Sequence, residues 1–296
     1  MDRLVRIAGV EQASGPRADL SGSQSVDRAL RLLALIGREP AGGLPLGEIV
    51  LESGLNKPTA RRLLLALMRA GLVEQEPETR HYCLGEEAFV LGVLAGRRHG
   101  LLELAMESLR RLSDVTLDTS FLTVRRERYA VCLHREEGTY PVRTHALQAG
   151  DQHPLGVGAG SLAMLAAMPD GEVEAILRAS ERCLLTRYPG FPPEVVRADL
   201  ASARRQGFAL NPGRLVASSW GVGVAFRYPD GRVAGALSIA AIDSRMQATR
   251  QGELAGHLSA EARRMERLLA EMFHSKAARS APSPMAQPVA ALARSA

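Results

Sequence analysis

The chain has 296 residues, 46% of them hydrophobic, and a formal net charge of +5, which is enough apolar material for two packed domains. No apolar run approaches the ~18 residues that cross a membrane, and the N-terminus lacks the apolar core of a signal peptide, so we expect a cytoplasmic protein. The three cysteines are widely spaced and odd in number, which argues against a disulfide framework and a zinc site.

Residues 1–22 combine Gly, Ser and Pro with little periodicity and are predicted to form a flexible arm. Helical spacing of apolar residues predicts a first helix over 25–36, with Ser25 as its N-cap, and a second short helix over 46–53. Ile49 and Val50 are expected on the buried side of the second helix. Gly54 then makes a tight turn.

The helix predicted after this turn has two distinct faces. The face expected to be buried consists of Ala60, Leu63, Leu64 and Leu67. The opposite face consists of Arg61, Arg62, Leu65 and Arg69. Asn56 suits the N-cap position and Gly71 suits a left-handed C-cap. Residues 55–70 hold four basic residues and no acidic one, a pattern found both on solvated surface helices and on helices that contact DNA.

A β-hairpin is predicted next, with strands at 72–75 and 80–85 around the polar turn 76–79. Three helices followed by a hairpin is the order of a winged helix-turn-helix, in which the third helix enters the major groove and the wing contacts the DNA backbone or minor groove. The sequence therefore predicts a DNA-binding domain over residues 23–85.

The remainder predicts an α/β domain with a mainly antiparallel sheet over 101–275, joined through a linker helix at 86–100 that is interrupted from Gly96 onward. The predicted strands are 119–125, 129–135, 142–145, 208–210, 222–226 and 233–241. The predicted helices are 101–112, 161–167, 172–179, 193–206 and 247–273. In the helix at 101–112 the apolar stripe is Leu102, Ala105, Leu109 and Leu112. A glycine-rich loop is predicted at 150–160, and the Ala/Ser/Pro-biased segment 276–296 is predicted to be disordered.

Taken together, the two halves resemble the IclR family of bacterial transcriptional regulators, from about Ser23 to Phe273. The N-terminal motifs that carry the resemblance are SVDRALRLLALI, LPLGEIVLESGLNKPTARRLLLALMRAGLVE and RHYCLG. The C-terminal motifs are HPLGVGAGSLAMLAAMP, RRQGFALNPGR and GVGVAFRYPDGRVAGALSIAA.

The resemblance implies a winged-helix DNA-binding domain and a GAF-like effector-binding domain, with no cofactor. It implies a homodimer or tetramer on a palindromic double-stranded operator, and most commonly a repressor. A small-molecule effector, often an organic acid or aromatic metabolite, is expected to modulate operator affinity.

This chain departs from the family pattern at several positions. The wing turn lacks the usual glycine and carries two acids, so its phosphate contacts are expected only from Arg80 and His81. Leu65 lies on the side that should face DNA, where it either contacts a thymine methyl group or packs under the wing. Gly221 stands where relatives often carry a pocket-lining cysteine, and Ala240 replaces a small polar residue, so the effector class is not implied.

The expected DNA contacts lie mainly on the third helix. Arg61 and Arg62 are expected to reach base edges or adjacent phosphates, because bidentate arginine distinguishes guanine. Lys57 and Thr59 lie near the helix N-terminus, where the dipole favours phosphate. Arg28, on the first helix, is either a further phosphate contact or a solvated surface residue.

The effector is expected between the loop before Ser161 and the late strands, as the resemblance implies. Gly158 and Ala159 allow a ligand to approach backbone N–H groups at the start of a helix, which favours anions. The other expected pocket residues, each of which could equally serve in packing, are Asn211, Trp220 and Ser238.

An enzyme is not expected. His134, His145 and His153 have spacings that match no metal motif, and Ser161 lies in GAGSL, which is not the nucleophile motif G-x-S-x-G. The alternatives are a ligand-independent architectural DNA-binding protein and a signalling protein that pairs through its sensor helices. A ligand-dependent change in operator affinity distinguishes the regulator from all of these.

Overall fold

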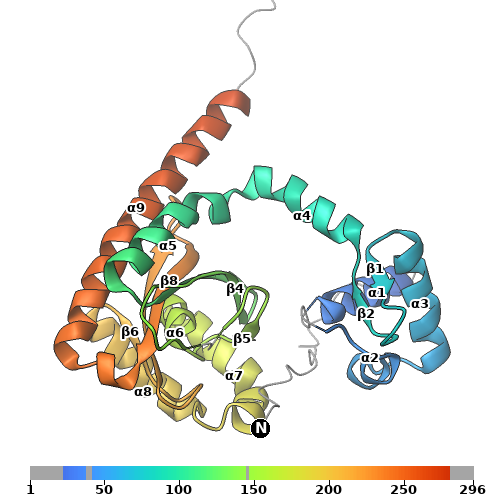
Figure 1. Ribbon diagram of the computed structural model, residues 1–296, viewed down its shortest axis with the longest axis horizontal. Helices are drawn as coiled ribbons and strands as arrows, with labels where there is room; N and C mark the ends of the chain where they lie inside the picture. The colour runs from blue at the N-terminus through green and yellow to red at the C-terminus, as the bar shows by residue number, and fades with distance from the viewer. Residues whose placement is uncertain (1–22, 38–41, 145–146, 281–296) are drawn as a thin grey trace, which may run out of the picture.

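The computed structural model describes residues 23–37, 42–144 and 147–280, so the predicted arm and residues 281–296 lie outside the described residues. Figure 1 shows an N-terminal helical domain and a C-terminal α/β domain joined by α4 (Glu86–His99). The elements of the N-terminal domain are α1 (Gln24–Ile36), α2 (Leu46–Ser53), α3 (Lys57–Arg69), β1 (Val73–Gln75) and β2 (Tyr82–Leu84).

The N-terminal domain packs α1, α2 and α3 around one apolar core, which the wing hairpin β1–β2 closes through Val73 and Tyr82. The buried residues of α3 are the four predicted ones, Ala60, Leu63, Leu64 and Leu67. Gly54 adopts the left-handed conformation that the turn needs. Two details of the sequence prediction for this domain were wrong. The N-cap of α1 is Ser23 instead of Ser25, and Val50 is only half-buried.

The segment before α2 adds a third strand-like piece to the wing. Leu44 and Tyr82 exchange backbone hydrogen bonds with N–O distances of 3.0 and 2.8 Å. Gly43 permits this approach because a Cβ there would lie 2.5 Å from Cys83 Sγ. The sequence predicts only a break between helices here, since nothing local marks so distant a pairing.

The linker helix α4 continues through Gly96, where the sequence predicts an interruption, and the chain breaks at Gly100 instead. An isolated glycine is tolerated inside a helix, which accounts for the difference. The next helix, α5 (Leu101–Thr116), is longer than predicted and buries Leu101, whereas Leu102 is 37% exposed.

The C-terminal domain contains a six-stranded antiparallel sheet. Its strands in spatial order are β5 (Gln152–Pro154), β4 (Tyr129–Glu136), β3 (Thr119–Arg126), β8 (Val233–Ile242), β7 (Ser219–Arg227) and β6 (Ala209–Pro212). No strand forms over 142–144, and residue 145 is outside the described residues. The edge strand β5 lies instead inside the predicted glycine-rich loop, where His153 pairs with Ala130 of β4.

Helices cover both faces of this sheet (Figure 1). α5 and α9 (Ala248–Ser280) pack on one face, and α6 (Ala159–Ala166), α7 (Asp170–Arg187) and α8 (Pro193–Gln206) pack on the other. α7 is longer than predicted, and α9 extends as far as Ser280, into the segment predicted to be disordered. None of the described helices combines the length and apolar character needed to cross a membrane.

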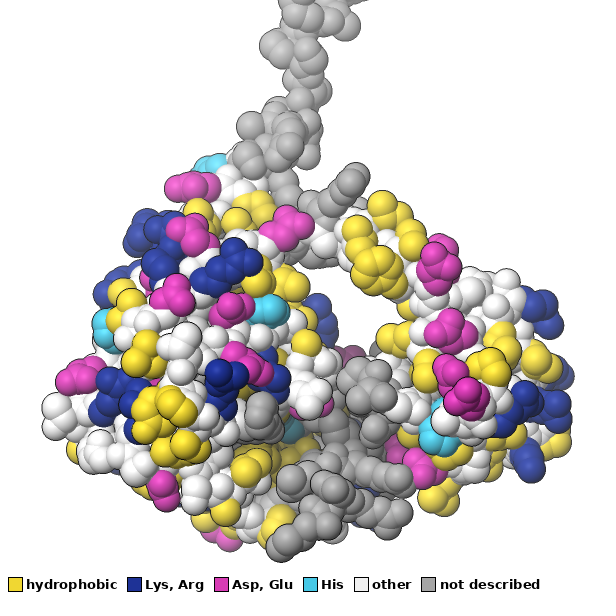
Figure 2. Space-filling view, in the orientation of Figure 1, with side chains coloured by type: hydrophobic (Ala, Val, Ile, Leu, Met, Phe, Trp, Pro, Cys, Tyr) yellow, Lys and Arg dark blue, Asp and Glu magenta, His cyan; other side chains and the backbone are white. Residues whose placement is uncertain are grey.

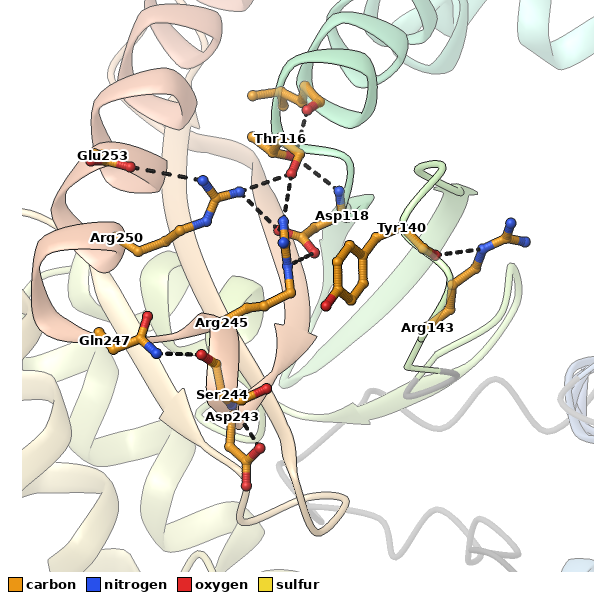
Figure 3. A network of polar contacts seen from close by, with 11 residues as sticks. Thr116, Asp118, Tyr140, Arg143, Asp243, Ser244, Arg245, Gln247, Arg250 and Glu253 are labelled. Atoms are coloured by element: carbon orange, nitrogen blue, oxygen red, sulfur yellow. Dashed lines mark hydrogen bonds and ion pairs between the residues drawn. The ribbon is translucent and has the colours of Figure 1, made fainter.

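A buried carboxylate joins the end of β8 to the neighbouring elements (Figure 3). Asp118, whose side chain is 2% exposed, accepts hydrogen bonds from Arg245 Nε at 3.0 Å and Arg250 at 3.2 Å. The Arg245 guanidinium also lies 3.9 Å from the centre of the Tyr140 ring. The α5–β3 junction, the residues after β8 and the start of α9 are therefore held together.

Candidate nucleic-acid interface and ligand pocket

The exposed face of α3 is basic. Lys57, Arg61, Arg62 and Arg69 are all exposed, and none of them forms an ion pair with another described residue. Figure 2 shows Lys and Arg side chains gathered over this side of the N-terminal domain. Unpaired surface cations without acidic neighbours on the same helix attract phosphate.

The N-terminus of α3 is closed by Asn56, whose Oδ1 accepts the Thr59 N–H at 2.9 Å. Thr59 itself is half-buried. Leu65 is 46% exposed and is not among the residues packed on the core that the wing closes. Arg28 is exposed on α1.

The wing brings Arg80 and His81 to different positions. Arg80 is exposed, with φ of 61°, and its carbonyl accepts a hydrogen bond from Gln75 Nε2 at 2.9 Å. His81 Nδ1 lies 2.7 Å from the Gly42 carbonyl oxygen, which ties the wing to the segment before α2. One nitrogen of the His81 ring is therefore already engaged within the protein.

A cavity of about 40 Å³ lies in the C-terminal domain, between the start of α6 and strands β3, β7 and β8. The structure brings to it all five residues predicted to surround an effector, namely Gly158, Ala159, Asn211, Trp220 and Ser238. Since ~10–15 Å³ is enough for one water molecule, the space suits only a few heavy atoms. Residues at the start of α6 and residues of strands that are distant in sequence thus line one cavity.

Glycines let the start of α6 approach the sheet. A Cβ at Gly223 would lie 2.6 Å from the Ala159 carbonyl carbon and oxygen, and a Cβ at Gly160 would lie 3.2 Å from Ser238 Oγ. Gly158 has φ of 81° and precedes the helix, and no side chain caps it. The positive end of the helix dipole therefore lies at the cavity, where it favours a negative charge.

Two polar residues of the cavity wall have structural partners. Ser161 Oγ accepts the Gly156 N–H at 2.9 Å and lies 3.2 Å from the Pro154 carbonyl oxygen, to which it donates. Asn211 Oδ1 accepts the Arg214 N–H at 3.3 Å. The Ser161 hydroxyl therefore holds the turn before α6.

His153 also lines the cavity and was not among the predicted effector residues. It is 4% exposed, its ring forms no hydrogen bond with a described residue, and burial lowers the pKa of the imidazole to about 4. The ring nitrogen Nε2 would lie 3.7 Å from a Cβ at Gly158. The available sequence signal was its place in HPLGVGAG, the motif that supplies the cavity glycines.

The other two histidines considered for a metal are elsewhere. His134 Nε2 lies 3.0 Å from Glu136 Oε2, and His145 is outside the described residues. Within the part of the chain that the structure describes, no three His, Cys, Asp or Glu side chains gather as a metal site would require.

Comparison with known proteins places both halves in one family. The IclR helix-turn-helix domain matches residues 25–77, and the C-terminal domain of the bacterial transcriptional regulator IclR matches residues 94–267. The transcriptional repressor IclR of Escherichia coli K12 is 27% identical over 190 residues, which are 64% of this chain and 69% of that protein.

Solved structures agree. A regulator of Silicibacter sp. TM1040 assigned to IclR has a TM-score of 0.72 and 28% identity, covering 83% of this chain and 96% of its own. An IclR homologue of Microbacterium hydrocarbonoxydans, crystallised with 4-hydroxybenzoate, has a TM-score of 0.66 and 21% identity, covering 84% and 100%. The chain therefore belongs to the IclR family of transcriptional regulators, with an N-terminal helix-turn-helix domain and a C-terminal α/β domain.

Proposed function

We propose that this protein is a repressor that binds its operator through α3 and loses operator affinity when a small organic acid or aromatic metabolite occupies the cavity beside α6. The observation that carries the proposal is that one chain combines a basic helix face with a small internal cavity. One is the unpaired basic face of α3. The other is the small cavity where a helix N-terminus meets three strands.

On the DNA side, Arg61 and Arg62 are the residues proposed to read base edges, each good contact discriminating by ~1–3 kcal/mol. Lys57 and Thr59, at the start of α3, are proposed to contact the sugar–phosphate backbone. Exposed Leu65 lies on the same face and is suited to a thymine methyl group. The outlying phosphate contacts proposed are Arg28, Arg80 and His81.

On the ligand side, the described residues of the cavity wall are largely apolar, with a few hydroxyl side chains, Asn211 and His153 as the polar groups, and none of them is acidic. The absence of a described acidic side chain, together with the uncapped start of α6, favours a small ligand that carries a negative charge. The volume of about 40 Å³ favours a short organic acid. A ligand with a ring, such as the 4-hydroxybenzoate found in the Microbacterium homologue, requires the cavity to widen.

A second copy of the chain is the proposed partner of the linker helix. The apolar side chains of α4 are exposed, with Phe89 at 72% and Leu94 at 55%, and Figure 2 shows hydrophobic side chains covering this helix. Val26 and Leu30 of α1 are exposed as well. Such patches mark interaction sites, and a two-fold dimer presents two recognition helices to the two halves of a palindrome.

The proposal is tested by recovering the genomic DNA that the protein binds and measuring the affinity of that DNA for variants by fluorescence anisotropy at physiological salt. Arg62→Ala is expected to weaken specific binding by ~10-fold or more, because it removes a base contact. Arg110→Ala, which changes an exposed arginine of α5, is the matched control and should bind as the unmodified protein does. Unchanged affinity of Arg62→Ala would contradict the assignment.

A further inference from the structure

Among the described residues that line the cavity beside α6, His153 is the one ionisable side chain. The residues around the space are glycines, apolar side chains, hydroxyl side chains and Asn211, together with His153. His153 is almost fully buried, and its ring lacks a hydrogen-bond partner among the described residues. The ring therefore offers the cavity a polar group that no described residue engages, and a ligand in the cavity can hydrogen-bond to it.

Charged groups on the elements packed around His153 are already engaged. Asp151 lies two residues before His153, and its carboxylate accepts the Gln148 N–H at 2.7 Å. Beyond β6, Arg214 is paired with Asp199. On β4, which also carries Tyr129 and Cys132, Arg135 is paired with Glu137 and His134 lies 3.0 Å from Glu136. α6 and β8 contain no ionisable residue.

We propose that His153 is the anchor for the carboxylate of the effector and that effector binding places a proton on its ring. This inference rests on the proposed function, since it concerns the same cavity. The imidazole lies beside the start of α6, since its Nε2 would be 3.7 Å from a Cβ at Gly158, the residue that precedes the helix. A carboxylate between them accepts one hydrogen bond from the ring and others from backbone N–H groups.

Proton uptake follows from the environment of the ring. In the free protein burial alone lowers the pKa of His153 to about 4, so the ring is neutral near neutral pH. A carboxylate within hydrogen-bond distance raises the pKa of an imidazole by ~1–3 units. The proton comes from solvent and is returned when the ligand leaves. Carboxylate affinity is therefore expected to rise, by up to ~tenfold per pH unit, as pH falls from about 7 to about 5.

The inference is tested by calorimetry on the full chain, with acetate, propanoate, lactate and 4-hydroxybenzoate as probes and the corresponding amides as uncharged controls. Titrations in two buffers of different ionisation enthalpy count the protons taken up. At least one carboxylate is expected to bind, with proton uptake that increases towards lower pH. The corresponding amide is expected to bind at least ~tenfold more weakly. His153→Gln should abolish the uptake and the pH dependence, and His134→Gln should leave both unchanged.

If His153→Gln fails to fold, the ring is followed in the unmodified protein by NMR of labelled histidine. Among the seven histidines of the chain, one should stay neutral below pH ~5 without ligand and shift its pKa upward with a bound carboxylate. Absence of binding by every carboxylate, equal binding of acid and amide, or pH dependence that survives His153→Gln would each overturn the inference. Operator binding is measured separately. If an uncharged ligand releases the operator, the proposed function stands although the His153 inference fails. If the protein does not bind an operator at all, the proposed function itself is refuted.

Discussion

At the residue scale, His153 couples the stability of the C-terminal domain to pH. Its imidazole titrates near 6.5 in the unfolded chain, and burial lowers the pKa to about 4 in the folded protein. Between these values the unfolded state binds the proton and the folded state does not. The contribution of neutral His153 to the stability of the folded state is therefore complete above about pH 6.5 and is lost as pH falls towards 4.

We expect this residue to lower the free energy of unfolding by about 3 kcal/mol between pH 7 and pH 4. Urea denaturation of His153→Gln across this range should show a shallower loss of stability than the unmodified protein, whatever the stability of the variant at pH 7. His134→Gln should keep the original slope. Parallel curves for His153→Gln and the unmodified protein would contradict the prediction.

Gly223 is a second residue whose role depends on one close contact. A Cβ there would meet the backbone of Ala159 at 2.6 Å and of Gly160 at 2.8 Å, so α6 would have to move away from the sheet. Gly223→Ala is expected to destabilise the protein by about 1–3 kcal/mol, as overpacking does, and to distort the cavity. Gly252→Ala, on α9 where a Cβ would meet nothing within 4 Å, should be neutral or stabilising in the same thermal denaturation assay.

At the element scale, substitutions at the N-cap of α3 can separate the stability of this helix from its proposed role in DNA binding. Asn56→Ala removes the acceptor of the Thr59 N–H and is expected to cost about 1 kcal/mol of stability. Asn56→Asp preserves the cap but adds a negative charge beside the proposed phosphate contacts. It should therefore keep the stability of the unmodified protein and weaken operator binding, with greater weakening at low salt. Equal operator affinity for Asn56→Asp would contradict this placement of the DNA.

The Asp118 network joins the α5–β3 junction, the residues after β8 and the start of α9 (Figure 3). Asp118→Asn removes the charge that pairs with Arg245 and Arg250, and we expect a loss of about 3 kcal/mol. This is the lower end of the range for a broken buried pair, because both arginines keep some contact with solvent. Glu107→Gln changes an exposed carboxylate that pairs with Arg111 and Arg264 and should cost less than about 1 kcal/mol. Chemical denaturation that showed equal losses would argue against a special role for Asp118.

At the scale of the whole molecule, the proposed dimer requires the exposed apolar side of α4. Phe89→Glu places a charge in that surface and is expected to produce monomers in sedimentation equilibrium and to reduce operator affinity at least ~tenfold, since two half-sites are then bound independently. Leu185→Glu, which changes an exposed leucine of α7, is the control and should leave both measurements unchanged. Monomeric unmodified protein with full operator affinity would contradict the proposal.

Elements whose signals are local were predicted well. α8 runs from Pro193 to Gln206 as predicted, because proline begins it and Gly207 ends it in the left-handed conformation. α3 has the predicted buried face, and its cap and C-terminal glycine are the predicted residues. The order of three helices and a hairpin was sufficient to identify the N-terminal fold, since each signal lies within a few residues of the element it specifies.

Features that depend on distant contacts were decided only by the tertiary structure. β5 and the Leu44–Tyr82 bridge exist because another strand offers hydrogen-bond partners, and three residues carry no periodicity of their own. The five cavity residues were expected around one effector only because of the family resemblance, and the packing of α6 on the sheet is what brings them to one space. His153 was missed for the same reason. The chemistry of a histidine is set by burial, and burial depends on residues remote in sequence that only the folded chain brings together.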